Sequence, residues 1–430
     1  MIWTLRLAGL TLTGLLAAVF FMPFGITTSA GDTPIERKIS VPARPLEVVC
    51  PGSLYQLGGA DGTDIDSLES LGDADFYLIE NGEPTPYRAD KPALFVAERN
   101  GQSSSVLSGY QWQQLSESRI AGLVSLSCKK PVTETWMLGG RTNLGSESLL
   151  IIHNPDVLST ILDMKFFDGE TEESDSISLA PGETKVVNLA RYVSTDEAVG
   201  LNITSQGGRF AAWIQSKTNS GITPTGADIE AHNQLQKNPS MIISVLSEDL
   251  PAEFRIPQIH ALVPSASTAT VSISSLQGGL GDAFRVNLSE GVNSIEIPDL
   301  SPGSYRITVE VEQGLLSSRT VNPLIPDYSL TQSEAPISGE VQMVAVLDGQ
   351  IEVASVEESV VTLRITRAGV REAAVIGFAS GREMISADVQ AGDLVEIEGE
   401  GLLIRIIGQG AEYLPADNSN IGSDLSITVR

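Results

Sequence analysis

Five aspartates gather in one short stretch, and carboxylates in such numbers can bind a divalent cation. The stretch reads GGADGTDIDSLESLGDAD and covers residues 58–75. Asp61, Asp64 and Asp66 are the candidate ligands for Ca²⁺, which prefers carboxylate oxygens, but their spacing does not match that of an EF-hand loop. We therefore interpret the stretch as a solvated acidic loop and expect no cofactor, with Ca²⁺ binding as the alternative.

Three histidines could act as general bases near neutral pH. His153, His232 and His260 lie in a strand start, a linker and a strand, and each is interpreted as a surface or boundary residue. No Gly-x-Ser-x-Gly motif occurs that would mark the nucleophile elbow of a hydrolase. We predict no catalytic residue and expect the chain not to be an enzyme.

Two aromatic side chains could bind a sugar. Tyr110 and Trp112, in GYQWQQL, alternate in the way that places both rings on one face of an extended segment. Exposed rings of this kind are typical of carbohydrate platforms, whereas buried ones belong to a core. The pair is the candidate glycan contact, and burial in the core is the alternative.

The two cysteines are the remaining residues whose side chains could react or bind a metal. Cys50 ends LEVVC and Cys128 ends VSLSC, and in each segment apolar residues share a strand face with the cysteine. Two cysteines in an exported chain predict one disulfide. No further ligands are spaced for a metal site with them, so two buried free thiols are the alternative.

Export itself is predicted from residues 1–30. LRLAGLTLTGLLAAVFFMPFGI is uncharged after Arg6, and Thr28 and Ala30 fit the small residues of a cleavage site. The same run is long enough to remain as an uncleaved membrane anchor. Under either interpretation, the chain from about Gly31 onward lies outside the cytoplasm, and the membrane is contacted only through the N-terminal helix.

The charge balance excludes some partners. The 430 residues include 54 acidic and 27 basic residues, a formal net charge of −27. A surface of that sign repels phosphate backbones and anionic lipid headgroups. Nucleic acid is therefore not expected as a partner.

One small pattern occurs three times: SLAPGETKVVNL from residue 178, NLSEGVNSIEIP from 287 and DVQAGDLVEIEG from 388. Pro181 and Gly182 suit the centre of a type II turn, and Gly291 and Gly392 occupy the equivalent positions. Between the first two copies the offset is 109 residues, as from Met164 to Ile273, and it becomes 104 after the turn, as from Ile203 to Ile307.

Repeats of about a hundred residues with short alternating strands and frequent turns predict an all-β fold of serial antiparallel, immunoglobulin-like β-sandwich modules after one N-terminal apolar helix. The expected organisation is a signal peptide or anchor at 1–30, a cysteine-containing β region with the first sandwich at 31–215, a linker at 216–255, the second sandwich at 256–325, a tether at 326–339 and a third β module at 340–430.

Several local motifs resemble those of a known protein family. They are the cysteine pair, Trp136 followed by Gly139 and Gly140, the strand start Asn154-Pro155 and the Pro-Gly corner. With them, residues 46–330 resemble an uncharacterised family of actinobacterial exported proteins. The resemblance implies a cell-envelope location, in connection with envelope glycosyltransferases, and implies no catalytic residue.

These observations together predict a non-enzymatic exported protein at the extracellular face of the cytoplasmic membrane or secreted from it. Its expected role is that of a scaffold or accessory, with an envelope protein or polysaccharide as the partner. A carbohydrate-binding or carbohydrate-active extracellular protein, using Tyr110 and Trp112, is the alternative function.

Overall fold

The computed structural model divides the chain into two compact units, one formed by Met1–Ala43 with Gly422–Arg430 and the other by Arg44–Ile421. It describes residues 37–41, 45–58, 68–80, 82–97, 107–168, 172–279, 281–322, 325–372, 374–408, 411–413 and 425–429. In the first unit, β1 (Arg37–Val41) pairs antiparallel with β34 (Leu425–Val429). The proposed N-terminal helix of residues 1–30 lies outside the described residues.

The second unit begins with a module that contains the disulfide, which we call the cystine module. One sheet has the order β6-β5-β8-β9, and two strand pairs, β2-β7 and β3-β4, accompany it. Its strands are β2 (Leu46–Cys50), β3 (Tyr55–Leu57), β4 (Leu68–Ser70), β5 (Ala74–Glu80), β6 (Glu83–Ala89), β7 (Ala93–Ala97), β8 (Leu107–Ser116) and β9 (Ala121–Ser127). The predicted disulfide is confirmed: Cys50 is bonded to Cys128 with a Cα–Cα distance of 4.5 Å, in a core with Phe76 and Leu78.

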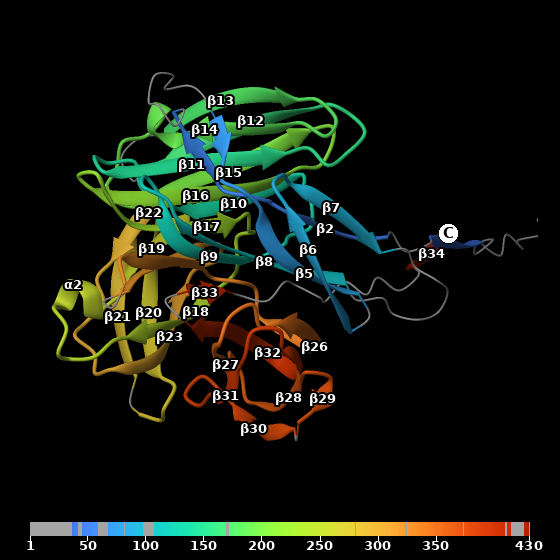
Figure 1. Cartoon of the computed structure of the whole chain (residues 1–430). Helices are drawn as coiled ribbons and strands as arrows, with labels where there is room; N and C mark the ends of the chain where they lie inside the picture. The colour runs from blue at the N-terminus through green and yellow to red at the C-terminus, as the bar shows by residue number, and fades with distance from the viewer. Residues whose placement is uncertain are drawn as a thin grey trace, which may run out of the picture. The chain divides into compact units, whose positions relative to one another are not determined.

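The first sandwich packs the sheet β10-β15-β12-β13 against the sheet β14-β11-β16-β17 (Figure 1). In β12 the apolar residues alternate with exposed ones, so that Leu162, Met164 and Phe166 enter the shared core. The elements are β10 (Glu134–Gly139), β11 (Ser146–His153), β12 (Thr160–Phe167), β13 (Glu172–Leu179), β14 (Thr184–Asn188), the 3-10 helix η1 (Leu189–Arg191), β15 (Val199–Gln206), β16 (Ala211–Ser220) and β17 (Thr223–Ala231).

The second sandwich repeats this topology strand for strand, with the sheets β18-β23-β20-β21 and β22-β19-β24-β25. Its elements are β18 (Ser240–Val245), the short helix α2 (Ala252–Arg255), β19 (Gln258–Val263), β20 (Ser267–Ser275), β21 (Asp282–Leu288), β22 (Gly291–Ile295), β23 (Gly303–Glu310), β24 (Leu315–Asn322) and β25 (Asp327–Gln332). Met164 faces Ile203 in the first sandwich and Ile273 faces Ile307 in the second, which confirms both sequence offsets of the repeat.

The predicted type II turn is also present. Gly182 has a φ of 69°, and the N–H of Glu183 donates to the carbonyl of Ala180 over 3.1 Å. Gly392 has a φ of 91° in a corresponding turn, which is closed by a bond from Asp393 N–H to the carbonyl of Gln390.

The third module is built around one long bent strand, β32. The first half of β32 lies between β26 and β28, and its second half lies between β27 and β33. Gly401, with a φ of 60°, occurs where the partners change. The strands are β26 (Ile337–Val344), β27 (Gly349–Ser355), β28 (Ser359–Arg367), β29 (Val370–Arg371), β30 (Val375–Ala379), β31 (Ile385–Val389), β32 (Leu394–Gly408) and β33 (Ala411–Tyr413).

Two segments differ from the sequence-based expectation. Residues 216–255, expected to be a linker, contain the end of β16 together with β17 and β18, and residues 326–339, expected to be a tether, contain β25. The apolar alternation that marks a strand is missing from both segments because buried polar side chains, among them Asp228, Glu230 and Asp327, occupy core-facing positions.

Candidate functional site

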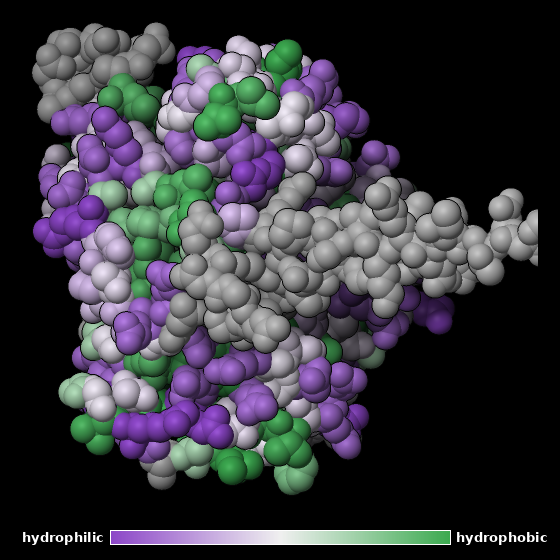
Figure 2. Space-filling model, turned by 90° about the vertical axis from the view of Figure 1, so that its right-hand side faces the viewer, coloured by the Kyte–Doolittle hydropathy of each residue, from purple (hydrophilic) through white to green (hydrophobic). Residues whose placement is uncertain are grey.

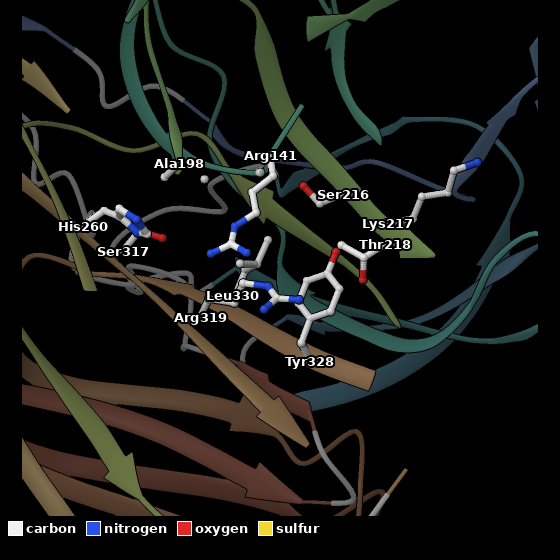
Figure 3. A pocket seen from close by; sticks show the side chains of 12 residues that line it. Arg141, Ala198, Ser216, Lys217, Thr218, His260, Ser317, Arg319, Tyr328 and Leu330 are labelled. Carbon is white, nitrogen blue, oxygen red and sulfur yellow. The ribbon is translucent and has the colours of Figure 1, made fainter. Parts of the chain in front are cut away.

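A pocket lies between the two repeated sandwiches, and we call it the inter-sandwich pocket (Figure 3). A volume of about 20 Å³ in it is open to water-sized groups. It is lined by the turn after β10, by β16 and Ala198 of the first sandwich, and by β19, β24 and β25 of the second: Gly139, Gly140, Arg141, Ala198, Ser216, Lys217, Thr218, His260, Ser317, Arg319, Tyr328 and Leu330.

Two arginines extend into this pocket. The guanidinium carbon of Arg319 lies 4.1 Å from the ring centre of Tyr328, in a cation–π contact. Arg141, whose guanidinium donates to the side-chain carbonyl of Gln258, extends toward Arg319 (Figure 3). Burial, and secondarily the charge of Arg141, lowers the pKa of Arg319. No carboxylate of the described residues forms an ion pair with either guanidinium.

The other charged groups of the pocket have partners. His260 Nε2 contacts the carboxylate of Glu197, whose pKa this hydrogen bond lowers. Lys217 is buried, and its ammonium lies 2.9 Å from the carboxylate of Glu147 and points away from the two arginines (Figure 3). The hydroxyl of Tyr328 is buried and has no hydrogen-bond partner among the described residues, and burial raises its pKa.

Two glycines shape one wall of the pocket and explain the Gly-Gly motif after Trp136. A Cβ on Gly139 would lie 1.4 Å from Oε2 of Glu230, so only glycine leaves room for this carboxyl group. Gly140 has a φ of 70°, a conformation that side chains disfavour, and a Cβ there would approach Ser148 Oγ to 2.6 Å.

Behind the pocket, three buried carboxyl groups meet where the cystine module and both sandwiches adjoin. We call Asp228, Glu230 and Asp327 the junction carboxyls. Asp327 accepts hydrogen bonds from the backbone N–H groups of Leu123, Ala227 and Tyr328, and Asp228 accepts them from Ile229 and Leu330. Burial raises the pKa of Asp327 to about 6 and that of Asp228 well above its usual range.

Of the three junction carboxyls, Glu230 has the fewest hydrogen-bond partners. Its Oε1 accepts from the hydroxyl of Ser317 over 3.3 Å, whereas its Oε2 has no partner in hydrogen-bond geometry among the described residues. Burial raises its pKa to about 8, so the group is largely neutral at pH 7. It also borders a pocket of about 50 Å³ with both polar and apolar lining, which is large enough for water.

A larger groove lies where the cystine module, the first sandwich and the start of the third module adjoin. It has a volume of about 440 Å³, and Lys129 and Glu334 form an ion pair of 2.5 Å within it. His232 lines the groove, and its Nε2 donates a hydrogen bond to the carbonyl of Lys130 over 2.8 Å. Burial lowers the pKa of His232 to about 4, so the ring is neutral at pH 7.

The proposed glycan pair is placed inside the molecule. Tyr110 is fully buried and its hydroxyl donates to the carbonyl of Gln342 over 3.1 Å. Trp112 is half-buried and stacks on Tyr77 with 5.3 Å between ring centres. Both rings do lie on one face of β8, but that face packs against the core of the third module, so they form no exposed platform.

The other sequence-based candidates are not brought together. Asp61, Asp64 and Asp66 lie outside the described residues. His153, His232 and His260 are all buried rather than at the surface, and they belong to three separate surroundings. Within the described ranges no cluster of three or more His, Cys, Asp or Glu could hold a metal ion, and no helix there is long and apolar enough to cross a membrane.

Sequence reasoning missed Arg141, Arg319 and the junction carboxyls. Each occurs in a polar segment in which neither spacing nor alternation separates a buried charge from a solvated one. For Glu230 one signal did exist: the consecutive glycines Gly139 and Gly140 directly after a strand indicate that another group approaches the backbone closely.

The fold and the site define an all-β protein of serial small antiparallel sheets, and its disulfide indicates an extracytoplasmic location. The chain belongs to a family of unknown function, DUF5719, whose model matches residues 85–392. No curated protein matches the sequence. A solved structure described as a tetra-tandem repeat in the extending region of a large adhesion protein is similar at 9% identity and a TM-score of 0.11, covering 84% of this chain and 92% of that one.

Proposed function

We propose that the protein is a non-enzymatic scaffold or accessory of the cell envelope, built from immunoglobulin-like modules and exposed at the extracellular face of the cytoplasmic membrane. The observation that carries the proposal is that buried contacts tie its modules together. A scaffold must keep its binding surfaces at fixed spacing, whereas modules without a substantial interface move independently.

Polar contacts join the first three modules. Asp327 of the second sandwich accepts from Leu123 of the cystine module over 2.8 Å and from Ala227 of the first sandwich over 3.3 Å. Asp228 of the first sandwich in turn accepts from Leu330 of the second over 2.6 Å. Such bonds are formed only when the three modules keep one arrangement, because a buried polar group without a partner costs free energy.

The third module is held by hydrogen bonds from a buried arginine and by apolar packing. Arg405 is 1% exposed, and its guanidinium lies 2.6 Å from Glu352 of the same module while donating to Ile242 and Ser244 of the second sandwich. On another side, Ile79, Tyr110 and Leu123 of the cystine module enter the core of the third module.

Cross-linking in native membranes tests the proposal. The full-length protein would be cross-linked, purified and analysed by mass spectrometry, and its N-terminus read in the same digest. The scaffold proposal predicts a reproducible envelope-protein partner. It further predicts that Arg405→Met, which removes the hydrogen bonds of Arg405 to the second sandwich, reduces recovery of this partner, whereas Arg371→Met, at an exposed ion pair within the third module, does not.

A different result would favour the alternative function. Co-purifying glycan without a protein partner, together with an N-terminus at Gly31, would contradict the scaffold proposal and support a released carbohydrate-binding protein. Equal recovery of the partner by Arg405→Met and the wild type would contradict the claim that the fixed arrangement matters.

A further inference from the structure

We propose that the inter-sandwich pocket binds the phosphate group of a phosphorylated ligand, held between Arg141 and Arg319. In a chain of net charge −27, both guanidiniums extend into one pocket and neither forms an ion pair with a described carboxylate. Two like charges at close range repel each other, and an anion between them removes that repulsion. This inference does not depend on whether the protein has a protein partner.

The donors of the pocket fit an oxyanion. Arginine binds phosphate and carboxylate through two parallel N–H groups, and Arg319 is held in place by the ring of Tyr328, 4.1 Å away. Arg141 is oriented by a hydrogen bond to the neutral amide of Gln258. Both guanidiniums are therefore positioned before a ligand arrives.

The buried hydroxyl of Tyr328 is an independent sign of a ligand. Tyr328 is 1% exposed, lines the pocket, and its Oη has no hydrogen-bond partner among the described residues. A buried hydroxyl without a partner costs free energy, which a bound acceptor would recover. The phosphate oxygens would supply that acceptor.

Charge and size favour phosphate over carboxylate. A phosphate monoester carries a charge of about −1.5 to −2 at pH 7 and three acceptor oxygens, which suits two guanidiniums and a hydroxyl better than a planar carboxylate with a single charge does. Glu197, which is hydrogen-bonded to His260, offsets part of the charge of Arg141, whereas no described carboxylate forms an ion pair with Arg319. The free volume open to water-sized groups is only about 20 Å³, so the rest of the ligand would lie outside the pocket.

Calorimetric titration of the full-length protein with inorganic phosphate tests the proposal. We expect saturable binding of one phosphate, weakened roughly tenfold or more in Arg319→Gln and in Arg141→Gln, because each loses a charge-assisted contact. Arg371→Gln, an exposed arginine of the third module, should bind as the wild type does. Sodium acetate at equal ionic strength should not displace the phosphate.

Tyr328→Phe keeps the test decisive if the arginine variants fail to fold. Its hydroxyl has no hydrogen-bond partner in the part of the chain that the structure describes, so the thermal midpoint should not fall, whereas phosphate binding should weaken several-fold. Absence of saturable binding by the wild type, or equal binding by the wild type and all four variants, would overturn the proposal. Displacement of the phosphate by acetate would overturn the assignment to phosphate.

Discussion

The carboxylate of Asp327 accepts a hydrogen bond of 2.8 Å from the backbone N–H of Leu123, although 204 residues separate the two in sequence. Leu123 lies in β9 of the cystine module and Asp327 begins β25 of the second sandwich. Together with the bond from Ala227, this contact makes one carboxyl group the meeting point of three modules.

Figure 2 shows another side of the molecule, where hydrophobic and hydrophilic residues are interspersed.

Asp327→Ala should therefore destabilise the whole junction. The change leaves the backbone N–H groups of Leu123 and Ala227 buried without an acceptor, at a cost of about 1–3 kcal/mol for each unsatisfied group. Denaturant unfolding measures the loss. Asp249→Ala, at an exposed loop position, is the matched control and should change the free energy of unfolding by less than about 0.5 kcal/mol. Equal effects of the two changes would contradict the role given to Asp327.

Glu230 should make stability fall as the pH rises. Its folded pKa of about 8 exceeds the ordinary value of 4.5, so its contribution is complete below pH 4.5 and is lost between pH 4.5 and about 8, where ionisation favours the unfolded chain. Glu230→Gln removes this ionisation. The variant should gain a few kcal/mol relative to the wild type between pH 5 and pH 8, measured as thermal midpoints across that range. Parallel curves for the two proteins would contradict the prediction.

Gly139→Ala should lower the free energy of unfolding because one neighbouring side chain leaves no room for a Cβ. The new Cβ would lie 1.4 Å from Glu230 Oε2, and displacing a buried side chain in this way typically costs about 1–3 kcal/mol. The cost should shrink when Glu230 is replaced by alanine as well, which a double-mutant cycle measures. Gly279→Ala, where the new Cβ would lie 3.5 Å from its nearest neighbour in ordinary van der Waals contact, is the control. Strict additivity of the Gly139 and Glu230 changes would show that they do not interact.

Reduction of the disulfide should destabilise the cystine module. The bond between Cys50 and Cys128 closes a loop of 78 residues, and in the chain-entropy description such a loop contributes about 4 kcal/mol. Unfolding of a Cys50→Ala/Cys128→Ala protein should thus begin at a markedly lower denaturant concentration than that of the wild type. Addition of reductant should shift the wild type in the same direction and leave the variant unchanged; a shift of both would point to another cause.

The repeat, the turns and the disulfide could be predicted from the sequence because each has a local signature. Pro181 and Gly182 fix a turn by their own backbone preferences, and alternating apolar residues such as Leu162 and Met164 mark a strand that has one buried face. The offsets of the repeat matched positions of one copy with those of the next, whereas the pairing of Met164 with Ile203 was not predicted.

The strands β17 and β25 and the inter-sandwich pocket could not be predicted. Their buried residues are polar, and what makes them stable is a partner in another module: Leu330 N–H for Asp228, and Leu123 N–H for Asp327. A sequence shows the type of a residue but not the group that it meets across a module boundary. Tyr110 and Trp112 illustrate the converse, since the third module covers rings that could have been exposed.

Differential scanning calorimetry of the full-length protein tests the central claim, that the modules of Arg44–Ile421 form one fixed body. Coupled modules unfold together, so we predict one transition for this unit, with equal calorimetric and van't Hoff enthalpies. Arg405→Met, which removes the hydrogen bonds from Arg405 to Ile242 and Ser244 of the second sandwich, should weaken this coupling and lower the ratio of the van't Hoff to the calorimetric enthalpy. Several resolved transitions in the wild-type protein, each belonging to one module, would contradict the account.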